Sequence, residues 1–359
     1  MKKPLSLSFF ILLTLLAKAQ SSYEYVVEKV IDDVYVLKPE VGDYRWVTSN
    51  VIVIINTEDV LVVDSGLLPE AATEAIKEIR KLTAMPVKFL LNTHWHGDHW
   101  QGNEVFLKEF PGLEIISTEQ GYQAMQRNGL KWINSYYPKY FQLMIEGYEN
   151  DLKKGVTSDG KPLSKQVTHQ MSIGIQDVKN DLASLKKIKP TLPTLTFTKE
   201  LVFRRGGREF QFHYLGVGNT VGDAVLYLPK EKMLIPGDLI VYPSPYESGA
   251  FSKEWIQTSK ALEQFELLYL IPGHGAVQKD SNYLIYINAL FAEIAKQMND
   301  AYLAGSVNTD EAILRVTHES VVSALKRNPK FLSYVDQLDP NFVKAAVKGS
   351  FKSIIMSPN

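Results

Sequence analysis

A single hexapeptide in the first third of the chain holds an unusual concentration of metal-ligand side chains. The segment HWHGDH comprises His94, His96, Gly97, Asp98 and His99 around one tryptophan, in a chain of 359 residues with seven histidines and no cysteine. Imidazole nitrogen and carboxylate oxygen are the ligands that zinc or iron takes when thiolate is absent. His94 and His96 alternate along an extended segment, and Gly97 permits a tight turn before Asp98 and His99. The segment predicts a site for one or two metal ions; a solvated histidine-rich loop is the alternative.

The elements before this motif place it at the end of a buried strand. Four short runs of apolar or alternating residues precede it and are typical of strands. They lie at residues 25–30, 34–37, 51–55 and 60–63. Residues 69–83 have apolar side chains at helical spacing with a proline near the start, and residues 87–91 return to a strand pattern. The order strand, helix and strand leads into HWHGDH, which we expect on a loop.

The rest of the chain alternates between helical and strand patterns. Residues 121–189 are polar and helical in period, which predicts an insertion over the core. This insertion contains a cluster of aromatic residues for which core packing is favoured, with a cover over the site as the alternative: Trp132, Tyr136, Tyr137, Tyr140 and Phe141. Strands are expected at 195–197, 224–228, 233–235 and 267–271, and a hairpin over 201–215 that turns at Gly206-Gly207. From residue 283 the pattern is helical.

The first nineteen residues are typical of a secretory signal peptide. Two lysines precede an apolar run from Leu5 to Leu16, and residues 17–19 (AKA) have small side chains at the A-x-A spacing, which predicts cleavage after Ala19. The apolar run is shorter than the ~20 residues that a membrane-spanning helix needs, so no membrane anchor is expected. The mature chain is expected to be exported, either to the periplasm or as a secreted protein.

The composition limits the partners of the mature chain. The chain has 39 basic and 40 acidic residues, and three lysines but no acid lie in the signal segment, so 36 bases and 40 acids remain after cleavage. This mildly acidic balance disfavours a nucleic-acid partner. The expected partner is a small-molecule substrate, and the sequence carries no signal for an oligomeric state.

The motif and three later segments resemble the metallo-β-lactamase superfamily, whose signature H-x-H-x-D-H is met by HWHGDH. Asp64 in VVDSG is similar to the family's aspartate at the end of an early strand, Asp238 in LIPGD to its metal-bridging aspartate, and His274 in IPGHG to its last histidine ligand. The resemblance covers residues 24–280 in the family's order. It implies an α/β (α+β) fold class, an αββα sandwich with the metals at one edge of its two sheets.

The resemblance also implies a domain organisation. After the signal peptide at 1–19, we expect a metallo-β-lactamase-like domain over residues 20–280, with the helical insertion at about 121–189. A C-terminal helical extension follows over residues 281–359.

Asn219 is the departure from the family pattern. The family carries G-x-G-H-T, whereas this chain has GVGNTVGD, with Asn219 at the position of the third histidine of the first metal. Three interpretations stay open: the amide oxygen ligates that metal weakly, a water completes the shell, or one metal alone binds Asp98, His99 and His274. His213 could replace the missing ligand, but strand alternation favours an ordinary histidine on the polar face of its strand.

The resemblance implies hydrolysis through a zinc-bound hydroxide that attacks an ester, lactone, amide or β-lactam carbonyl, because zinc lowers the pKa of bound water from about 15.7 to near 7. Asp98 and Asp238 would orient the hydroxide. Asp64 would fix a ligating imidazole from outside the ligand shell; a strand-end aspartate that caps backbone amides is the alternative. The implied metal ligands are His94, His96, Asp98, His99, Asn219, Asp238 and His274. Zinc is the expected cofactor, as one or two ions, with iron as the alternative.

Two other functions are compatible with these residues. One is a non-catalytic zinc-binding protein that has lost activity together with the histidine at position 219, and the other is a single-iron oxygenase on the same fold. Retention of the other metal positions favours the hydrolase. The segment 242–251 follows Asp238 directly, so we expect it to rim the site.

Overall fold

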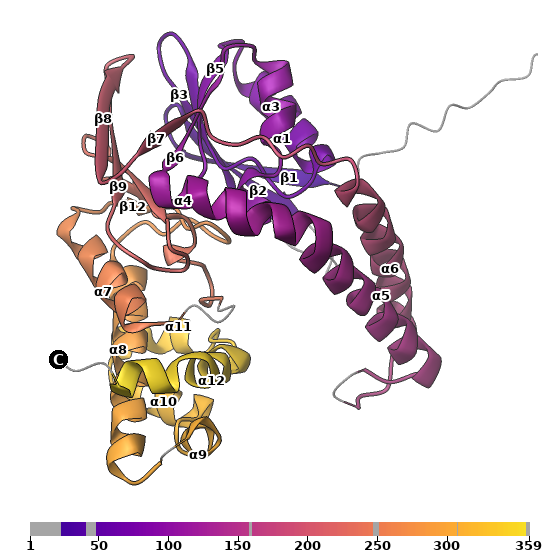
Figure 1. The fold of residues 1–359 in the computed structure, drawn as a ribbon, viewed down its shortest axis with the longest axis vertical. Helices are drawn as coiled ribbons and strands as arrows, with labels where there is room; N and C mark the ends of the chain where they lie inside the picture. The colour runs from indigo at the N-terminus through magenta and orange to yellow at the C-terminus, as the bar shows by residue number, and fades with distance from the viewer. Residues whose placement is uncertain (1–22, 41–47, 158–159, 247–250, 307, 357–359) are drawn as a thin grey trace, which may run out of the picture.

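The computed structural model describes residues 23–40, 48–157, 160–246, 251–306 and 308–356. The expected signal peptide and its cleavage site lie outside the described residues, as do residues 247–250 of the expected rim. Two β-sheets pack face to face in the described part of the chain, with helices on their outer faces (Figure 1). The αββα sandwich is therefore confirmed.

The first sheet holds the five strands expected before the HWHGDH motif and the strand expected at residues 195–197, together with a strand at residues 114–118 that was not expected. Its seven described strands lie in sequence order, antiparallel from the first to the fourth and parallel from there to the seventh. They are β1 (Glu24–Ile31), β2 (Val34–Glu40), β3 (Val51–Ile55), β4 (Val60–Val63), β5 (Val87–Leu91), β6 (Glu114–Thr118) and β7 (Leu195–Phe197). The central strands β3 and β4 are runs of Val, Ile and Leu, because layers cover both of their faces.

The second sheet has the order β12-β11-β10-β9-β8 among the described residues. Its strands are β8 (Glu200–Arg205), β9 (Arg208–Tyr214), β10 (Ala224–Leu228), β11 (Met233–Ile235) and β12 (Tyr269–Leu270), the last being shorter than expected. The β8–β9 hairpin turns at Gly206 and Gly207, which have φ values of 57° and 76°. A two-residue hairpin turn requires this left-handed backbone, and glycine adopts it without steric cost.

Three layers of apolar packing hold the sandwich together. Ile52 and Val63 of the first sheet meet Phe210 and Leu226 of the second between the sheets. The helices α1 (Pro69–Leu82) and α3 (Asn103–Glu109) cover the outer face of the first sheet. The helices α7 (Lys253–Ala261) and α8 (Asn282–Leu303) cover the second. Both sheets are thus buried on two faces, and their edges carry the connecting loops.

The segment expected as a helical insertion forms a long hairpin. It comprises α4 (Glu119–Ala124), the π-helical turns η1 (Met125–Gly129) and η2 (Trp132–Tyr136), α5 (Tyr137–Lys154) and α6 (Lys165–Leu185). Figure 1 shows α5 and α6 leaving the sandwich side by side. The expected position over the core holds for the start of the insertion, where Ile133 and Tyr137 pack with Leu67 and Trp100. Farther out, α5 and α6 pack chiefly on each other.

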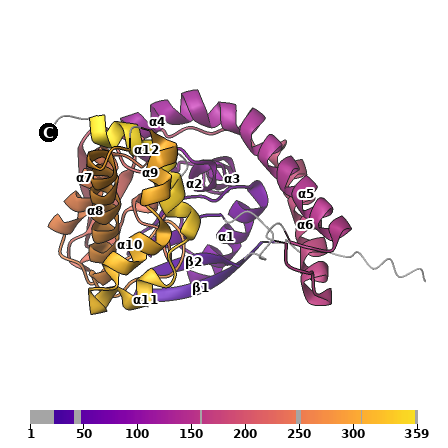
Figure 2. The same ribbon diagram turned by 90° about the horizontal axis from the view of Figure 1, so that it is seen from below.

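The C-terminal helices pack on α8 and share its core. They are α9 (Thr309–Arg315), α10 (His318–Leu325), α11 (Leu332–Val335) and α12 (Pro340–Met356). Phe342 of α12 stacks on Phe291 of α8, within the same apolar cluster that covers the second sheet. Figure 2 shows these helices gathered on one side of the sandwich. Among the described residues, no helix has the length and apolar character needed to cross a bilayer.

Candidate metal centre

Four loops bring the expected ligands to one edge of the sandwich. His94 and His96 follow β5, and the one-turn helix α2 (Gly97–Trp100) carries the next two ligands. Asp238 lies in the short helix η3 (Gly237–Leu239) after β11, and His274 follows β12. The expectation that the whole motif lies on a loop is thus corrected, because Asp98 and His99 sit in a helical turn.

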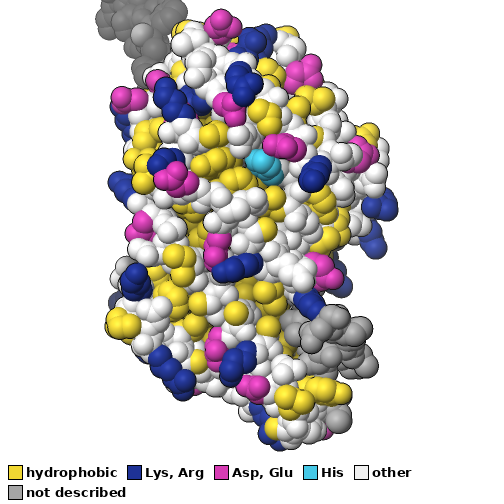
Figure 3. Space-filling model, turned by 90° about the vertical axis from the view of Figure 1, so that its left-hand side faces the viewer, with side chains coloured by type: hydrophobic (Ala, Val, Ile, Leu, Met, Phe, Trp, Pro, Cys, Tyr) yellow, Lys and Arg dark blue, Asp and Glu magenta, His cyan; other side chains and the backbone are white. Residues whose placement is uncertain are grey.

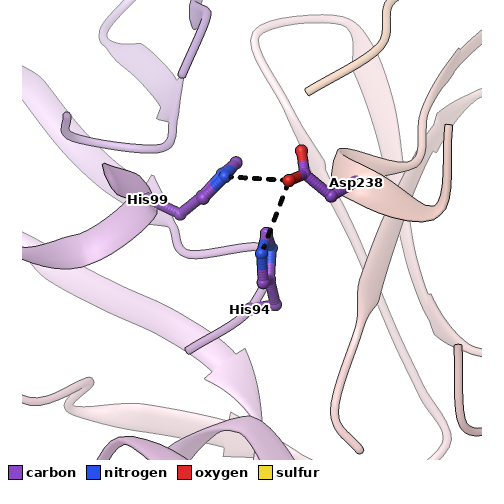
Figure 4. A group of neighbouring side chains, drawn as sticks. All are labelled: His94, His99 and Asp238. Atoms are coloured by element: carbon purple, nitrogen blue, oxygen red, sulfur yellow. Dashed lines mark ion pairs between the residues drawn. The ribbon is translucent and has the colours of Figure 1, made fainter. Parts of the chain in front are cut away.

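Two overlapping groups of donor atoms form at this edge. In the first, Asp238 Oδ2 lies 3.8 Å from His94 Nε2 and 3.5 Å from His99 Nε2 (Figure 4). In the second, Asp98 Oδ2 lies 3.4 Å from His99 Nε2 and 3.1 Å from His274 Nε2. All donor atoms within each group lie within 4.8 Å of one another. Ligand atoms at ~2.1 Å from one tetrahedral ion are roughly 3.4 Å apart, so these spacings fit a metal.

Unpartnered buried atoms give a second test of this fit. His99 Nε2 and Asp238 Oδ1 are buried and have no hydrogen-bond partner. A buried polar atom without a partner costs about 1–3 kcal/mol, so such atoms need another source of stabilisation. A cation within the donor groups would provide it, and the residues present therefore fit one or two zinc or iron ions.

The histidines have different protonation tendencies. Burial lowers the pKa of His94 well below its usual value and that of His96 to about 4, which keeps both imidazoles neutral and able to donate a lone pair. Burial acts in the same direction on His99 and His274, but the two site carboxylates outweigh it. They raise the pKa of His99 well above the usual range and that of His274 to about 10. In the metal-free site these two imidazoles therefore hold protons that an incoming cation would displace.

Asp64 supports the site from the end of β4. Its Oδ2 accepts a hydrogen bond from His99 Nδ1 at 2.7 Å, and Oδ1 accepts one from the Thr93 backbone N–H at 2.8 Å. The Thr93 hydroxyl donates to Oδ2 at 2.9 Å. Because Nδ1 donates to Asp64, Nε2 is the His99 nitrogen that faces the carboxylates of Asp98 and Asp238, and its lone pair becomes available when a cation displaces the Nε2 proton. The Asp64 side chain therefore does both of the things expected as alternatives: it accepts a hydrogen bond from a backbone amide, and it orients the His99 imidazole.

Asn50 fixes the loop that carries His274. Its side-chain amide donates to the carbonyls of Pro272 and Gly275, both at 3.0 Å, and its backbone N–H donates to the carbonyl of Gly273 at 2.8 Å. Asn50 is not among the site residues expected from the sequence. The only signal for it was a run of three polar residues, Thr-Ser-Asn, directly before an apolar strand.

Asn219 reaches the same edge from the loop between β9 and β10. Its side chain is 3% exposed, and its Nδ2 lies 3.5 Å from His96 Nδ1. Its Oδ1 is buried without a hydrogen-bond partner. His94 Nε2 lies 3.0 Å from the same His96 Nδ1, so these three side chains form a third polar group. His213 lies on β9 itself, where its ring packs against Phe265, and it belongs to none of these groups.

A cavity of about 800 Å³ opens in front of the donor groups. His96, Asp98, Asp238 and His274 form its floor. Its walls include side chains of η2 and α5 on one side and of the segment after Asp238 on the other: Trp132, Tyr136, Tyr140, Met144, Tyr148, Tyr242, Pro243, Ser244, Pro245 and Tyr246. Residues 242–246 of the expected rim therefore border the site, whereas Phe251 is buried in the apolar core beside α8.

The expectation of core packing holds in part for the helical aromatics: Trp132 and Tyr140 are half-buried against the apolar core and also border the cavity, whereas Tyr136 is 39% exposed. Trp132, Tyr136 and Tyr140 line the cavity, because residues four apart share one helix face. Phe141 is fully buried in the core as expected. Tyr137 is also buried, and its hydroxyl accepts a hydrogen bond of 2.8 Å from Gly97 N–H, which ties the insertion to the motif.

Figure 3 shows a different face of the molecule, where basic and acidic side chains are interspersed with apolar ones. Over the described residues of that face, no large patch of one sign appears. This mixture agrees with the nearly balanced composition of the chain.

Comparison with known proteins places these features in a family context. The model of the metallo-beta-lactamase superfamily matches residues 44–274, which is more than half of the chain. The chain is 24% identical over 225 residues to a linear primary-alkylsulfatase of Pseudomonas sp. (strain ATCC 19151), in a match that covers 61% of this chain and 40% of that protein. It is 24% identical over 213 residues to a type 2 metallo-beta-lactamase of Elizabethkingia meningoseptica, covering 57% and 79%.

Solved structures show the same fold. A metallo-beta-lactamase from Pontibacter korlensis superposes with a TM-score of 0.51 at 18% identity, covering 75% of this chain and 99% of that one. The stereoselective inverting sec-alkylsulfatase Pisa1 from Pseudomonas sp. superposes with a TM-score of 0.59 at 15% identity, covering 90% of this chain and 50% of that one. The chain thus spans about half or less of the length of the two alkylsulfatases.

Proposed function

Because the chain belongs to the metallo-beta-lactamase superfamily, we propose that it is a metal-dependent hydrolase acting on a small molecule in the cavity. The observation that carries this proposal is the meeting of His94, His99, Asp98, Asp238 and His274 at the cavity, where Asp98, Asp238 and His274 form part of the floor and His99 Nε2 and Asp238 Oδ1 have no hydrogen-bond partner. A purely structural cluster would pair these atoms within the protein. We also propose that the protein is exported, on the basis of its first nineteen residues.

We propose that the cofactor is zinc and that different side chains bind its two ions. Asp98, His99 and His274 would hold one ion, and His94 and His96, with Asn219 beside them, would hold the other. Asp238, whose Oδ2 lies 3.5–3.8 Å from the Nε2 atoms of His94, His99 and His274, would supply a further carboxylate ligand. When bound, the ions supply Lewis acidity and lower the pKa of a coordinated water. An amide oxygen is a poorer zinc donor than an imidazole, so the Asn219 side would be the weaker site.

The protein's own groups prepare the reaction in three ways. The aspartates at 98 and 238 are acceptor-only groups when ionised. Burial alone would raise their pKa values, but His99 and His274 outweigh it and hold both pKa values well below the usual range. The two carboxylates would orient the attacking water by accepting its hydrogen bonds. Asp64 keeps His99 in one tautomer, and Asn50 keeps the His274 loop in place. The aromatic walls limit access of bulk water to the scissile bond.

The bond that is cleaved is proposed to be an ester-type bond, with a carbonyl ester, lactone, amide or β-lactam as the first candidates. The similarity to an alkylsulfatase favours a sulfate ester as a second candidate. Both reactions place a developing negative charge on oxygen, which cations in this site would stabilise.

Metal content and hydrolysis test this proposal together. Full-length mature protein, purified without chelator at neutral pH, should contain one to two equivalents of zinc or iron by elemental analysis. It should hydrolyse at least one of a 4-nitrophenyl ester, a lactone, a chromogenic cephalosporin and 4-nitrophenyl sulfate. His99→Ala should remove most of the metal and all turnover, whereas the control His213→Ala should retain both. A metal-free wild type would refute the metal site, and a metal-loaded protein without hydrolysis would refute the enzyme in favour of a zinc-binding protein. Iron content with oxygen-dependent turnover would replace the hydrolase by an oxygenase.

A further inference from the structure

One wall of the cavity is a line of apolar side chains along the helical insertion. These side chains lie four residues apart and all border the cavity: Trp132, Tyr136, Tyr140, Met144 and Tyr148. Residues at this spacing share a helix face, so they form one continuous surface, which we call the apolar stripe. At about 1.5 Å per residue or slightly less, the stripe is roughly 20 Å long. Because it follows α5, it leads away from the sandwich (Figure 1).

The apolar stripe begins at the metal centre itself. The ring of His96 stacks on Trp132, with centroids 5.5 Å apart and planes at 18°. Trp132 stacks on Tyr136 at 4.3 Å, and Tyr136 stacks on Tyr140 at 6.0 Å. The rings of Trp132, Tyr136 and Tyr140 thus form one row that continues from His96. Such a row offers van der Waals contact along its length to an apolar chain.

The opposite wall and the charged residues of the cavity also favour an apolar ligand group beside the stripe. Val241, Pro243 and Pro245 provide apolar surface across from the stripe. Of the charged residues that line the described cavity outside the metal centre, Lys38 pairs with Glu28 at 2.8 Å, and Asp339 accepts hydrogen bonds from Asn341. These charges already have partners, so the stripe region favours an uncharged group.

We propose that the substrate is a linear amphiphile, with a polar hydrolysable head at the metal centre and an unbranched apolar tail along the apolar stripe. The identity of the head rests on the proposed function, whereas the tail site does not depend on turnover. An extended chain advances roughly 1.2 Å per bond, one third of the ~3.6 Å per extended residue. A twelve-carbon tail therefore reaches about 13 Å from the metal centre and passes Tyr140, while a six-carbon tail ends near Tyr136.

Binding of linear carboxylates tests the tail site without requiring hydrolysis. Isothermal titration of the zinc-loaded mature protein would compare hexanoate with dodecanoate, both below their micellar concentrations. A fully buried methylene contributes about a fourfold factor, so partial burial of six should still favour dodecanoate by at least a hundredfold. Tyr140→Ala should weaken dodecanoate binding by about tenfold or more and leave hexanoate within twofold.

Two further variants separate contact from other effects. Tyr140→Phe retains the ring and should keep the wild-type preference for dodecanoate. Leu143→Ala is the matched control, since Leu143 is an apolar residue of the same helix that is 54% exposed and does not line the cavity. It should also keep the preference.

Three results would overturn the tail site. The first is equal affinity of the wild type for hexanoate and dodecanoate. The second is a loss of dodecanoate affinity in Leu143→Ala as large as that in Tyr140→Ala. The third is an equal loss of affinity for both acids in Tyr140→Ala, which would mean that Tyr140 supports the metal centre instead. A length preference in a protein that hydrolyses nothing would support the tail site and count against the proposed function alone.

Discussion

Replacement of Asp64 by asparagine should weaken metal binding without removing a metal ligand. The side chain is fully buried and accepts three hydrogen bonds, one from His99 and two from Thr93, at 2.7–2.9 Å. Asparagine has nearly the same shape and tolerates the left-handed backbone at this position, where φ is 62°. It replaces one acceptor oxygen by an amide group that donates, so His99 Nδ1 or Thr93 loses its acceptor.

The size of the effect follows from these contacts. Loss of an outer partner of a metal-bound histidine typically weakens metal affinity 10- to 100-fold, about 1.4–2.7 kcal/mol. Loss of a hydrogen bond to a buried charged group lowers the free energy of unfolding of the metal-free protein by about 1.5–3 kcal/mol. Competition with a chromophoric zinc chelator measures the first quantity, and urea unfolding measures the second.

Asp59 provides a matched control at the other end of the same strand. It directly precedes β4 as Asp64 directly follows it, its side chain is 1% exposed, and it binds Arg205 and Asn56. Asp59→Asn should lower stability by a similar amount and leave zinc affinity within twofold of wild type. If Asp64→Asn bound zinc as tightly as wild type, or if both variants lost affinity equally, the assignment of Asp64 to the orientation of His99 would be wrong.

Three further outcomes are expected. Asn219→His should bind the weaker metal about tenfold or more tightly, because imidazole is the better zinc donor; an unchanged chelator titration would show that residue 219 does not contact a metal. Gly273→Ala should reduce metal affinity at least tenfold, because the new Cβ would lie 2.0 Å from Asp238 Oδ1. The control Gly147→Ala, whose new Cβ has nothing within 4 Å, should bind metal normally and gain up to about 1 kcal/mol of helix stability. Equal metal binding in both variants would refute the close approach of Gly273 to Asp238. N-terminal sequencing of protein from cell fractions should find a chain that begins near Gln20 outside the cytoplasm, and an intact Met1 on cytosolic material would exclude the signal peptide.

Local pattern in the sequence was sufficient for most of the sandwich. The buried strands β3, β4 and β5 are short apolar runs bounded by turn residues, and the hairpin turn requires glycine, so each could be recognised from fewer than ten neighbouring residues. The first four metal-ligand candidates could be found for the same reason, because they lie within six positions. Asp64, Asp238 and His274 were found only through family motifs, since each is a single residue of an ordinary type.

Only the tertiary structure decided what the polar and aromatic residues outside the motifs contact. Asn50 holds a loop more than 200 positions away, and nothing in its local sequence specifies that partner. Helical spacing showed that Trp132, Tyr136 and Tyr140 share a face, but a helix face with aromatic residues can meet either a core or a cavity. The choice depended on the direction in which α5 leaves the sandwich, which is set by the packing of distant segments against its first turns and not by the residues of the helix itself.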